Sequence, residues 1–301
     1  MKNKNIAILF AGMPRHFHKC YQSHLNFFNS SVYNFDYFIH TWNECWWNEK
    51  LRNIDGENFI QNPEVKESES LSRELQDIYS PKKIIVESQR KCKTLNEDIK
   101  SIRHLSQRIR PRLAHPFGEK KICLDSFNMG QTYSMQQSCK LKCEYEKEMN
   151  FKYDYVFRFR LDCLVKGYSE NFPKEENFKR IFKPNRLNFR WNQIKEGDIH
   201  LGDMFFGGST ELFNSICEDI YDYEIKMICE DLAGFSNDLN RWGLINCYTP
   251  EAIIGKRVKE EKIITDVNPH FPLFFPYRDY HEKMDNASWD EMYKKYTGKN
   301  I

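Results

Sequence analysis

The order of secondary-structure signals in the first third of the chain most limits the folds open to it. Three short apolar runs, at residues 5–12, 33–42 and 81–88, have the composition of buried strands. Between them, residues 16–31 place apolar side chains at helical spacing, and residues 64–79 form a polar amphipathic pattern. This strand–helix–strand–helix–strand order predicts an α/β fold with a mostly parallel, doubly wound, Rossmann-like sheet.

The rest of the chain extends this pattern less regularly. Residues 129–150 are predicted to form a long helix that leads into a fourth strand at 155–160. A strand near 203–208, a helix near 209–229 and a helix beginning at Thr249 follow, whereas the insertion at 89–126 has no predicted fold. We expect one domain over residues 1–301, with halves at 1–165 and 166–301, because neither a repeat nor a low-complexity linker separates them.

Composition argues against several classes of protein. The 301 residues are 40% hydrophobic, which suffices for a core, and the net charge of +2 argues against a dedicated nucleic-acid binder. No apolar run reaches the roughly 18 residues that span a bilayer, and the run at 6–12 ends in Pro-Arg instead of a cleavage site. The ten cysteines form no C-x-x-C pair, so we expect reduced thiols, no zinc site and a cytoplasmic location.

The ends of the predicted strands are the places to look for a site. In an open parallel sheet, ligands bind beyond the carboxyl ends of the strands. Four such ends lie at residues 12–15, 40–42, 87–88 and 160–162. Neither a G-x-G-x-x-G fingerprint nor a Walker loop follows the first strand, which argues against NAD enzymes and P-loop kinases.

The fourth strand end carries three charges. In the stretch YDYVFRFRLDC, at 153–163, Arg158, Arg160 and Asp162 alternate and are expected to share one face of the strand. A carboxylate there can hold Mg²⁺ or Mn²⁺ together with substrate phosphates, and a neighbouring arginine can neutralise phosphate charge. The alternative is that Arg160 and Asp162 form a simple ion pair at the edge of the sheet.

Four stretches together, IAILFAGMPRHF, DYFIHTW, YDYVFRFRLD and DMFFGGSTELF, resemble the GT-A-type glycosyltransferases. They are most similar to the small WavE-like families that build lipopolysaccharide and capsule, over about residues 5–42 and 128–258. The resemblance implies a GT-A-like domain and a nucleotide-sugar-dependent enzyme that glycosylates a hydroxyl of a bacterial or viral surface glycan. In it, residues 1–165 form the nucleotide-binding half and residues 166–301 the acceptor and catalytic half.

The resemblance also assigns residues to the nucleotide-sugar donor and its metal. R-x-R-x-D at 158–162 stands where other GT-A enzymes carry D-x-D, with Arg160 replacing the first acid. The metal, Mn²⁺ or Mg²⁺, is expected at Asp162. The expected donor-binding residues are Gly12, Arg15, Thr41, Trp42, Arg158, Arg160, Gly207 and Gly208. The alternative for Trp42 is core or rim packing beside Trp46 and Trp47, and for the two glycines it is a strand-to-helix turn capped by Ser209 or Thr210.

Two acidic residues are the main candidates for a general base. The GT-A enzymes that the chain resembles carry an acidic pair at the start of a helix, and TPEAIIGKR matches this shape with Pro250 in place of the first acid. The resemblance implies that Glu251, in the first turn of that helix, takes the proton of an acceptor hydroxyl. The alternative is that Glu251 only favours the helix dipole. Asp203 is the second candidate, and Glu230 with Asp231 forms a literal acidic pair in a weaker context.

The insertion carries a basic cluster at residues 100–118, which contain no acidic residue. Charge runs are usually solvated faces. The other interpretation is that Arg108, Arg110 and Arg112 bind an anionic acceptor such as a lipid-linked glycan, and hold the protein peripherally at the inner face of a membrane.

Two further classes of protein stay open. One is a non-catalytic glycan-binding or degenerate GT-A protein, since the first acid of D-x-D is replaced. The other is a transferase of another activated group, such as phosphoryl or nucleotidyl, because a fold does not determine a function.

Overall fold

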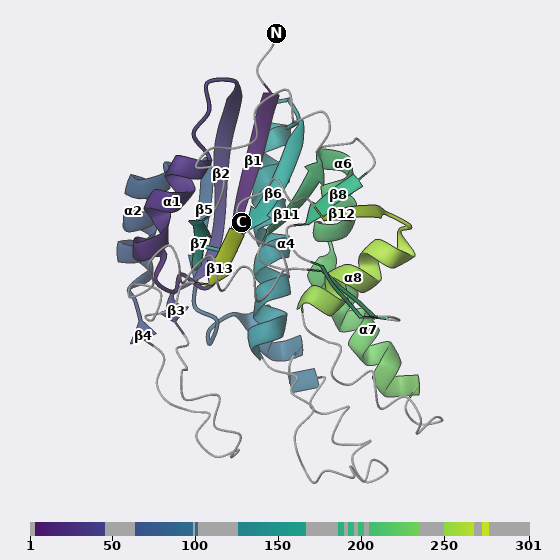
Figure 1. Cartoon of the computed structure of the whole chain (residues 1–301). Helices are drawn as coiled ribbons and strands as arrows, with labels where there is room; N and C mark the ends of the chain where they lie inside the picture. The colour runs from purple at the N-terminus through teal and green to yellow at the C-terminus, as the bar shows by residue number, and fades with distance from the viewer. Residues whose placement is uncertain are drawn as a thin grey trace, which may run out of the picture.

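The computed structural model describes residues 4–45, 64–98, 100–101, 126–166, 186–189, 192–195, 198–201, 205–234, 250–267 and 273–276. Within these residues, seven strands form one sheet (Figure 1). In spatial order they are β5 (Lys83–Glu87), β2 (Tyr33–Trp42), β1 (Lys4–Gly12), β6 (Tyr155–Phe159), β11 (Phe205–Ser209), β8 (Arg186–Phe189) and β12 (Ile264–Val267). Six of them run parallel, and β11, between β6 and β8, runs the opposite way.

The predicted α/β class and the mostly parallel sheet are confirmed. The strands expected at 5–12, 33–42, 81–88 and 155–160 correspond to β1, β2, β5 and β6. The strand expected near 203–208 is β11, whose reversed direction the sequence pattern did not indicate. Because β8, β11 and β12 come from the second half of the chain, one sheet joins both predicted halves.

Helices lie on both faces of the sheet, as in other doubly wound folds. One face is covered by α1 (Phe17–Phe27) and α2 (Ser68–Tyr79). The opposite face holds α4 (Ser126–Glu148), α6 (Thr210–Cys217), α7 (Ile220–Gly234) and α8 (Pro250–Glu260). The single helix expected near 209–229 is therefore two helices, α6 and α7, separated by a bend at 218–219.

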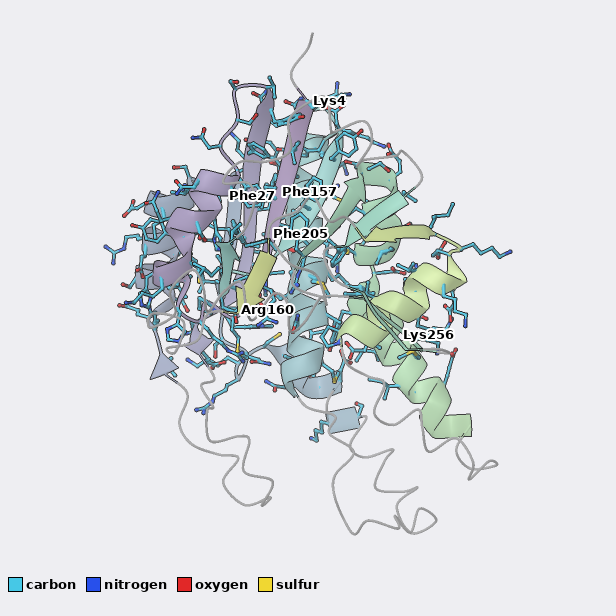
Figure 2. The ribbon with its side chains drawn as sticks, in the orientation of Figure 1. Lys4, Phe27, Phe157, Arg160, Phe205 and Lys256 are labelled. Carbon is cyan, nitrogen blue, oxygen red and sulfur yellow. The ribbon has the colours of Figure 1, made fainter. Side chains whose placement is uncertain are left out.

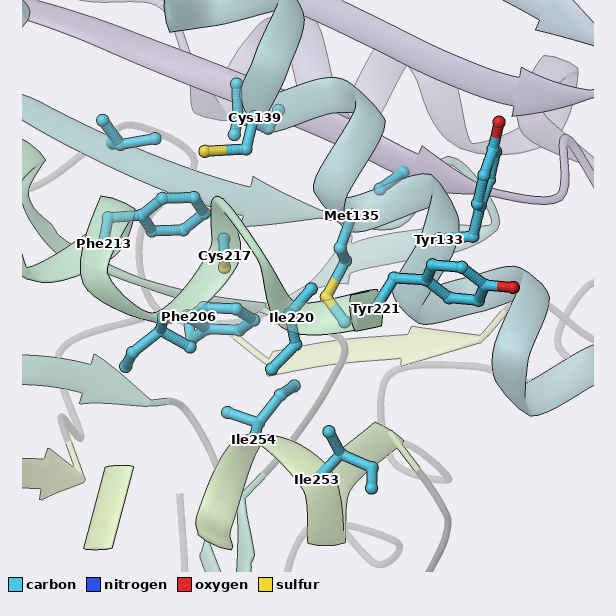
Figure 3. Packing of buried hydrophobic residues seen from close by; sticks show 14 of the residues in the cluster. Tyr133, Met135, Cys139, Phe206, Phe213, Cys217, Ile220, Tyr221, Ile253 and Ile254 are labelled. Atoms are coloured by element: carbon cyan, nitrogen blue, oxygen red, sulfur yellow. The ribbon is translucent and has the colours of Figure 1, made fainter. Parts of the chain in front are cut away.

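Alternation along β1 produces two cores. Ala7, Leu9 and Ala11 belong to the cluster on the α4 side of the sheet. Ile6, Ile8 and Phe10 belong to the cluster on the side of α1 and α2. All six are fully buried, as expected for a central parallel strand with helices on both sides. Figure 3 shows the α4-side cluster, where side chains from α4, β11, α6, α7 and α8 meet.

In the described part of the chain, three short strand pairs lie outside the main sheet, and each is antiparallel. They are β3 (Glu44–Cys45) with β4 (Glu64–Val65), β7 (Cys163–Lys166) with β13 (Leu273–Pro276), and β9 (Asn192–Lys195) with β10 (Asp198–Leu201). Across the described residues, no helix combines the length and the apolar character that a membrane span needs.

Candidate functional site

The topology points to a site between β1 and β6. After β1 the chain moves to β2 on one side, and it returns through α4 to β6 on the other. The strand order therefore changes direction between β1 and β6, which is the position at which doubly wound proteins bind ligands beyond the strand ends. The segment that follows β6 lies against α1, the helix that follows β1, since the Val165 amide donates to Ser23 Oγ at 3.1 Å. Because Phe10 pairs with Phe159, the loops at 12–15 and 160–162 begin at neighbouring positions. Figure 2 shows Arg160 toward this end of the sheet and Lys4 at the opposite end.

Gly12 forms the first turn of this site. Its φ of 119° lies in a region that L side chains rarely adopt, although a side chain there would meet no atom within 4 Å. The turn is held from two sides, because the Gly12 amide donates to Ser134 Oγ at 2.7 Å and Thr41 Oγ1 donates to the Gly12 carbonyl at 2.7 Å. The peptide at the end of β1 is thus fixed by α4 and β2 together.

Arg160 and Asp162 form the second part of the site. Arg160 Nε donates to Asp162 Oδ1 at 2.8 Å, and Nη2 donates to Oδ2 at 2.7 Å. This two-point geometry is the strongest form of an arginine–carboxylate pair. Asp162 is 3% exposed, whereas the side chain of Arg160 is 19% exposed. The ion pair that was the alternative interpretation is therefore present, and it fixes the guanidinium at the carboxyl edge of the sheet.

Helix α1 lies near Asp162. The negative charge of the Asp162 carboxylate acts to raise the pKa of both Cys20 and His24, which belong to this helix. His24 is fully buried, and burial lowers its pKa to about 4, so the ring is neutral at pH 7. Its Nε2 hydrogen-bonds the Cys163 carbonyl, which can only accept, so Nδ1 accepts from the Tyr79 hydroxyl at 2.8 Å. A neutral His24 adds no positive charge beside Asp162, whereas Arg160 forms an ion pair with it at 2.7 Å.

These residues do not fit a divalent cation as they stand. Mg²⁺ and Mn²⁺ prefer several oxygen ligands, and here both oxygens of Asp162 already accept from Arg160. Among the described residues, no three His, Cys, Asp or Glu side chains gather closely enough to hold a metal ion. A metal at Asp162 would have to displace a guanidinium from a buried carboxylate, so the predicted Mn²⁺ or Mg²⁺ gains no support from the donor set.

Arg158 does not share a face with Arg160 and Asp162, so the prediction that the three charges lie on one side of the strand is wrong. It is fully buried, donates from Nη2 to the Ala11 carbonyl at 3.4 Å, and interacts electrostatically with Cys217 of α6. The expected alternation fails because β6 ends at Phe159, and the chain then turns so that the Cys163 amide donates to the Arg160 carbonyl. Arg158 therefore lies on the α4 side, and Asp162 lies near α1.

Trp42 and Thr41, which were predicted to contact a nucleoside, both lie in the interior of the protein. Trp42 is 1% exposed, its indole donates to the Gly130 carbonyl at 3.1 Å, and its ring stacks on Tyr133 with centroids 5.5 Å apart. Thr41 is fully buried. Trp42 is thus packed in the core, as its alternative interpretation had it, whereas Trp46 and Trp47, its expected neighbours, lie outside the described residues. Thr41 acts indirectly by holding the Gly12 turn.

Glu87 is a residue of the candidate site that the sequence indicates only as the end of a predicted strand. It closes β5 at the same edge of the sheet, and its side chain is 36% exposed. His40 Nε2 donates to Glu87 Oε2 at 3.3 Å, and this hydrogen bond lowers the pKa of Glu87. His40 in turn is held by Ser134 Oγ at 2.8 Å. A fixed, ionised carboxylate thus lies two strands away from Gly12.

Gly207 and Gly208 lie inside β11 and not in a loop that could touch a donor. Because β11 is antiparallel, they pair with Phe157 and Val156, away from the carboxyl end of β6. A side chain at Gly207 would come within 2.4 Å of the Val156 carbonyl, so close strand packing explains this glycine. The predicted strand-to-helix turn is present instead, with Ser209 as the N-cap of α6.

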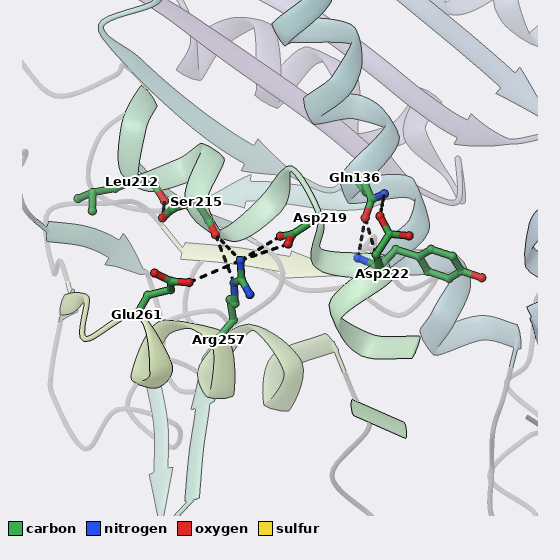
Figure 4. Close-up of polar contacts among 8 residues, drawn as sticks. Gln136, Leu212, Ser215, Asp219, Asp222, Arg257 and Glu261 are labelled. Atoms are coloured by element: carbon green, nitrogen blue, oxygen red, sulfur yellow. Dashed lines mark hydrogen bonds and ion pairs between the residues drawn. The ribbon is translucent and has the colours of Figure 1, made fainter. Parts of the chain in front are cut away.

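Helix α8 carries the predicted base and the arginine that follows it. Glu251 is the second residue of α8, in its first turn as expected. Arg257 lies on the same helix and binds the carbonyl of Ser215 and the carboxylates of Asp219 and Glu261 (Figure 4). These contacts attach α8 to α6 and to the bend before α7, so Arg257 has a structural role.

Several predicted site residues cannot be assigned contacts. Asp203, Arg108, Arg110 and Arg112, as well as the side chains of Glu251 and Asp231, lie outside the described residues. Glu230 is exposed and forms an ion pair with Lys226 at 3.8 Å. Arg15 is half-buried in the loop after Gly12, where its Nη2 donates to Met13 Sδ at 3.3 Å.

In comparisons with known proteins, neither a family model nor a curated protein matches the chain.

Proposed function

We propose that this chain transfers a sugar from a nucleotide-sugar donor to a hydroxyl of a surface-glycan acceptor, such as lipopolysaccharide, capsule or a viral glycan. The observation that carries the proposal is the fixed guanidinium of Arg160 beside the Gly12 turn, at the switch point of a mostly parallel sheet. Sugar transfer releases a nucleoside diphosphate, and a positioned guanidinium stabilises the charge that develops on this leaving group.

Neighbouring groups support the same ligand. Arg15 lies in the loop after Gly12 and is proposed to contact the diphosphate. Glu87 is ionised and fixed by His40 at the end of β5, two strands from β1, where a carboxylate can accept hydrogen bonds from ribose hydroxyls. Phosphates between β1 and β6 with a ribose toward β5 would lay the nucleotide across the carboxyl edge of the sheet.

The acceptor side of the reaction rests on residues known from the sequence. Glu251, in the first turn of α8, is the proposed general base, and Asp203 is the second candidate. Arg108, Arg110 and Arg112 are proposed to bind an anionic, lipid-linked acceptor, which would hold the protein at the inner face of a membrane. The grouping of these residues around one acceptor is part of the proposal.

One experiment tests the nucleotide site directly. A thermal-shift series with UDP, GDP, CDP and the matching nucleotide sugars, each with and without Mn²⁺, measures binding to the native state. At least one nucleoside diphosphate is expected to raise the melting temperature by several degrees, and Arg160→Ala is expected to remove the shift. The absence of a shift with every compound would contradict the proposal.

A non-catalytic glycan-binding protein is the second candidate, and the engagement of Asp162 by Arg160 favours it. Slow hydrolysis of the bound donor separates the two functions, because a transferase leaks some of its activated sugar to water. The enzyme is expected to release free sugar from the nucleotide sugar that gives the largest thermal shift. A binding protein would leave that compound intact, and a phosphoryl or nucleotidyl transferase would give products of different mass.

A further inference from the structure

We infer that Arg160, held by Asp162, takes the place of a divalent cation, so that a nucleoside diphosphate binds this site without metal. The inference rests on the proposed function, since it concerns how the same site binds its leaving group. It is carried by the two-point contact between Arg160 and Asp162 and by the burial of that carboxylate.

Formal charge favours this arrangement. A D-x-D pair with a bound dication sums to zero, since two carboxylates offset the two positive charges. Replacing the first aspartate by Arg160 changes the side-chain charge by two, which equals the charge that the metal would bring. Arg160 with Asp162 therefore also sums to zero without metal, and a dication added here would lie beside a guanidinium of the same sign.

Geometry favours it as well. Asp162 orients the guanidinium through Nε and Nη2, so less side-chain freedom is lost when a phosphate binds. The carboxylate itself lies in a turn closed by the Cys163 amide, within electrostatic range of the neutral His24. Asp162 is thus a positioning residue for Arg160, and it is not the metal ligand that the sequence predicted.

The test measures nucleotide affinity by calorimetry on the full chain, in EDTA and then in Mn²⁺, with the nucleoside diphosphate that gives the largest thermal shift. Wild-type affinity is expected to agree within about twofold between the two conditions. Asp162→Asn is expected to weaken binding about tenfold in both conditions, because Arg160 loses its charged partner. Arg160→Lys, the matched control, keeps the charge without the two-point geometry and is expected to show an intermediate loss.

A gain of metal dependence is the sharper arm of the test. Arg160→Asp rebuilds D-x-D, so its nucleotide affinity is expected to vanish in EDTA and to return with Mn²⁺. Electron paramagnetic resonance of Mn²⁺ without nucleotide gives a second readout, in which wild type leaves the free-ion signal unchanged and Arg160→Asp reduces it. Should Arg160→Asp not fold, Arg160→Ala replaces it and is expected to lose binding in both conditions.

The outcomes distinguish a failure of this inference from a failure of the proposed function on which it rests. Wild-type binding that appears only with Mn²⁺ would overturn the inference and leave the proposed function standing. Stoichiometric Mn²⁺ binding by wild type that is lost in Asp162→Asn would overturn it too. If no nucleoside diphosphate binds in either condition, both the proposed function and the inference that rests on it are wrong.

Discussion

Gly12 and Gly207 are glycines for different physical reasons. At Gly12 the space for a side chain is open, but a φ of 119° strains any other residue. At Gly207 the space is filled, because a side chain would meet Phe157 and the Val156 carbonyl. The first glycine serves the conformation of the candidate site, and the second serves the pairing of β11 with β6.

Alanine at each position distinguishes these reasons. Gly12→Ala is expected to lower the free energy of unfolding by about 1–2 kcal/mol through backbone strain. Gly207→Ala is expected to cost more, about 3 kcal/mol, because a backbone carbonyl cannot move aside as a flexible side chain can. Urea denaturation of both variants measures the difference. Equal losses would mean that strand pairing adjusts to the extra methyl group.

Cys143 is predicted to be a reactive thiol. It hydrogen-bonds with Cys139 and lies near the ammonium of Lys142, and these contacts lower its pKa to about 7. Asn214 Nδ2 also donates to its Sγ at 3.6 Å. Its labelling by iodoacetamide is therefore expected to rise with pH, with a midpoint near pH 7, and to level off above about pH 8.

The matched control for this prediction lies in the same molecule. Cys229 is partly exposed like Cys143, but burial raises its pKa, so its labelling should still be increasing at pH 9. Peptide mapping by mass spectrometry follows both thiols in one sample, and Cys139→Ala is expected to move the Cys143 midpoint upward. Parallel pH profiles for the two thiols would contradict the prediction.

Between elements, the contact of α4 with α7 contains a buried acid. Glu224 of α7 hydrogen-bonds Thr132 Oγ1 of α4, and Thr132 also donates to the Met129 carbonyl at 3.0 Å. One hydroxyl hydrogen cannot serve both acceptors, so a protonated Glu224 that donates to Thr132 satisfies the arrangement. Burial raises the pKa of Glu224 to about 8, which agrees with a neutral carboxyl at pH 7.

This acid makes stability depend on pH. The folded state keeps the Glu224 proton up to about pH 8, while the unfolded chain loses it near the ordinary value of 4.5. The contribution of Glu224 to stability is therefore full below about pH 4.5 and is lost as the pH rises to about 8. Glu224→Gln, which stays neutral and can still donate to Thr132, is expected to match wild type at pH 4.5 and to exceed its stability at pH 8.

Urea denaturation at several pH values measures this difference. Glu230→Gln on the same helix is the control, because Glu230 is exposed and should change stability little at any pH. A constant gap between Glu224→Gln and wild type across the pH range would show that the acid is not protonated in the folded state.

Local patterns predicted the elements better than they predicted the site. Apolar runs and helical spacing gave β1, β2, β5, β6 and α4, because they depend on neighbours within a few residues. The direction of β11 and the burial of Trp42 depend on partners distant in the chain, such as Gly130. Likewise, the alternating pattern predicts the same face for Arg158 and Arg160. Their environments differ because β6 ends at Phe159, between the two residues.

For the whole molecule, the shared sheet predicts one cooperative unfolding transition. The α4-side cluster takes residues from α4, α6, α7 and α8, so neither half of the chain has a complete core alone. Far-ultraviolet and near-ultraviolet circular dichroism are expected to give coincident urea midpoints. Arg257→Ala, which detaches α8 from Ser215 and Asp219, is expected to lower both midpoints together. Separate midpoints in wild type would indicate two independently stable parts.

The position of β1 has a consequence during protein synthesis. This strand leaves the ribosome before the other six strands of its sheet and can pair early with β2, but its other edge stays unpaired until β6, which follows α4 much later in the chain. At roughly 5–20 residues per second, the wait is on the order of ten seconds. Throughout it, an almost wholly apolar strand presents unpaired amide and carbonyl groups, which is a template for aggregation. The nascent chain is therefore expected to need chaperone protection until β6 closes the central sheet.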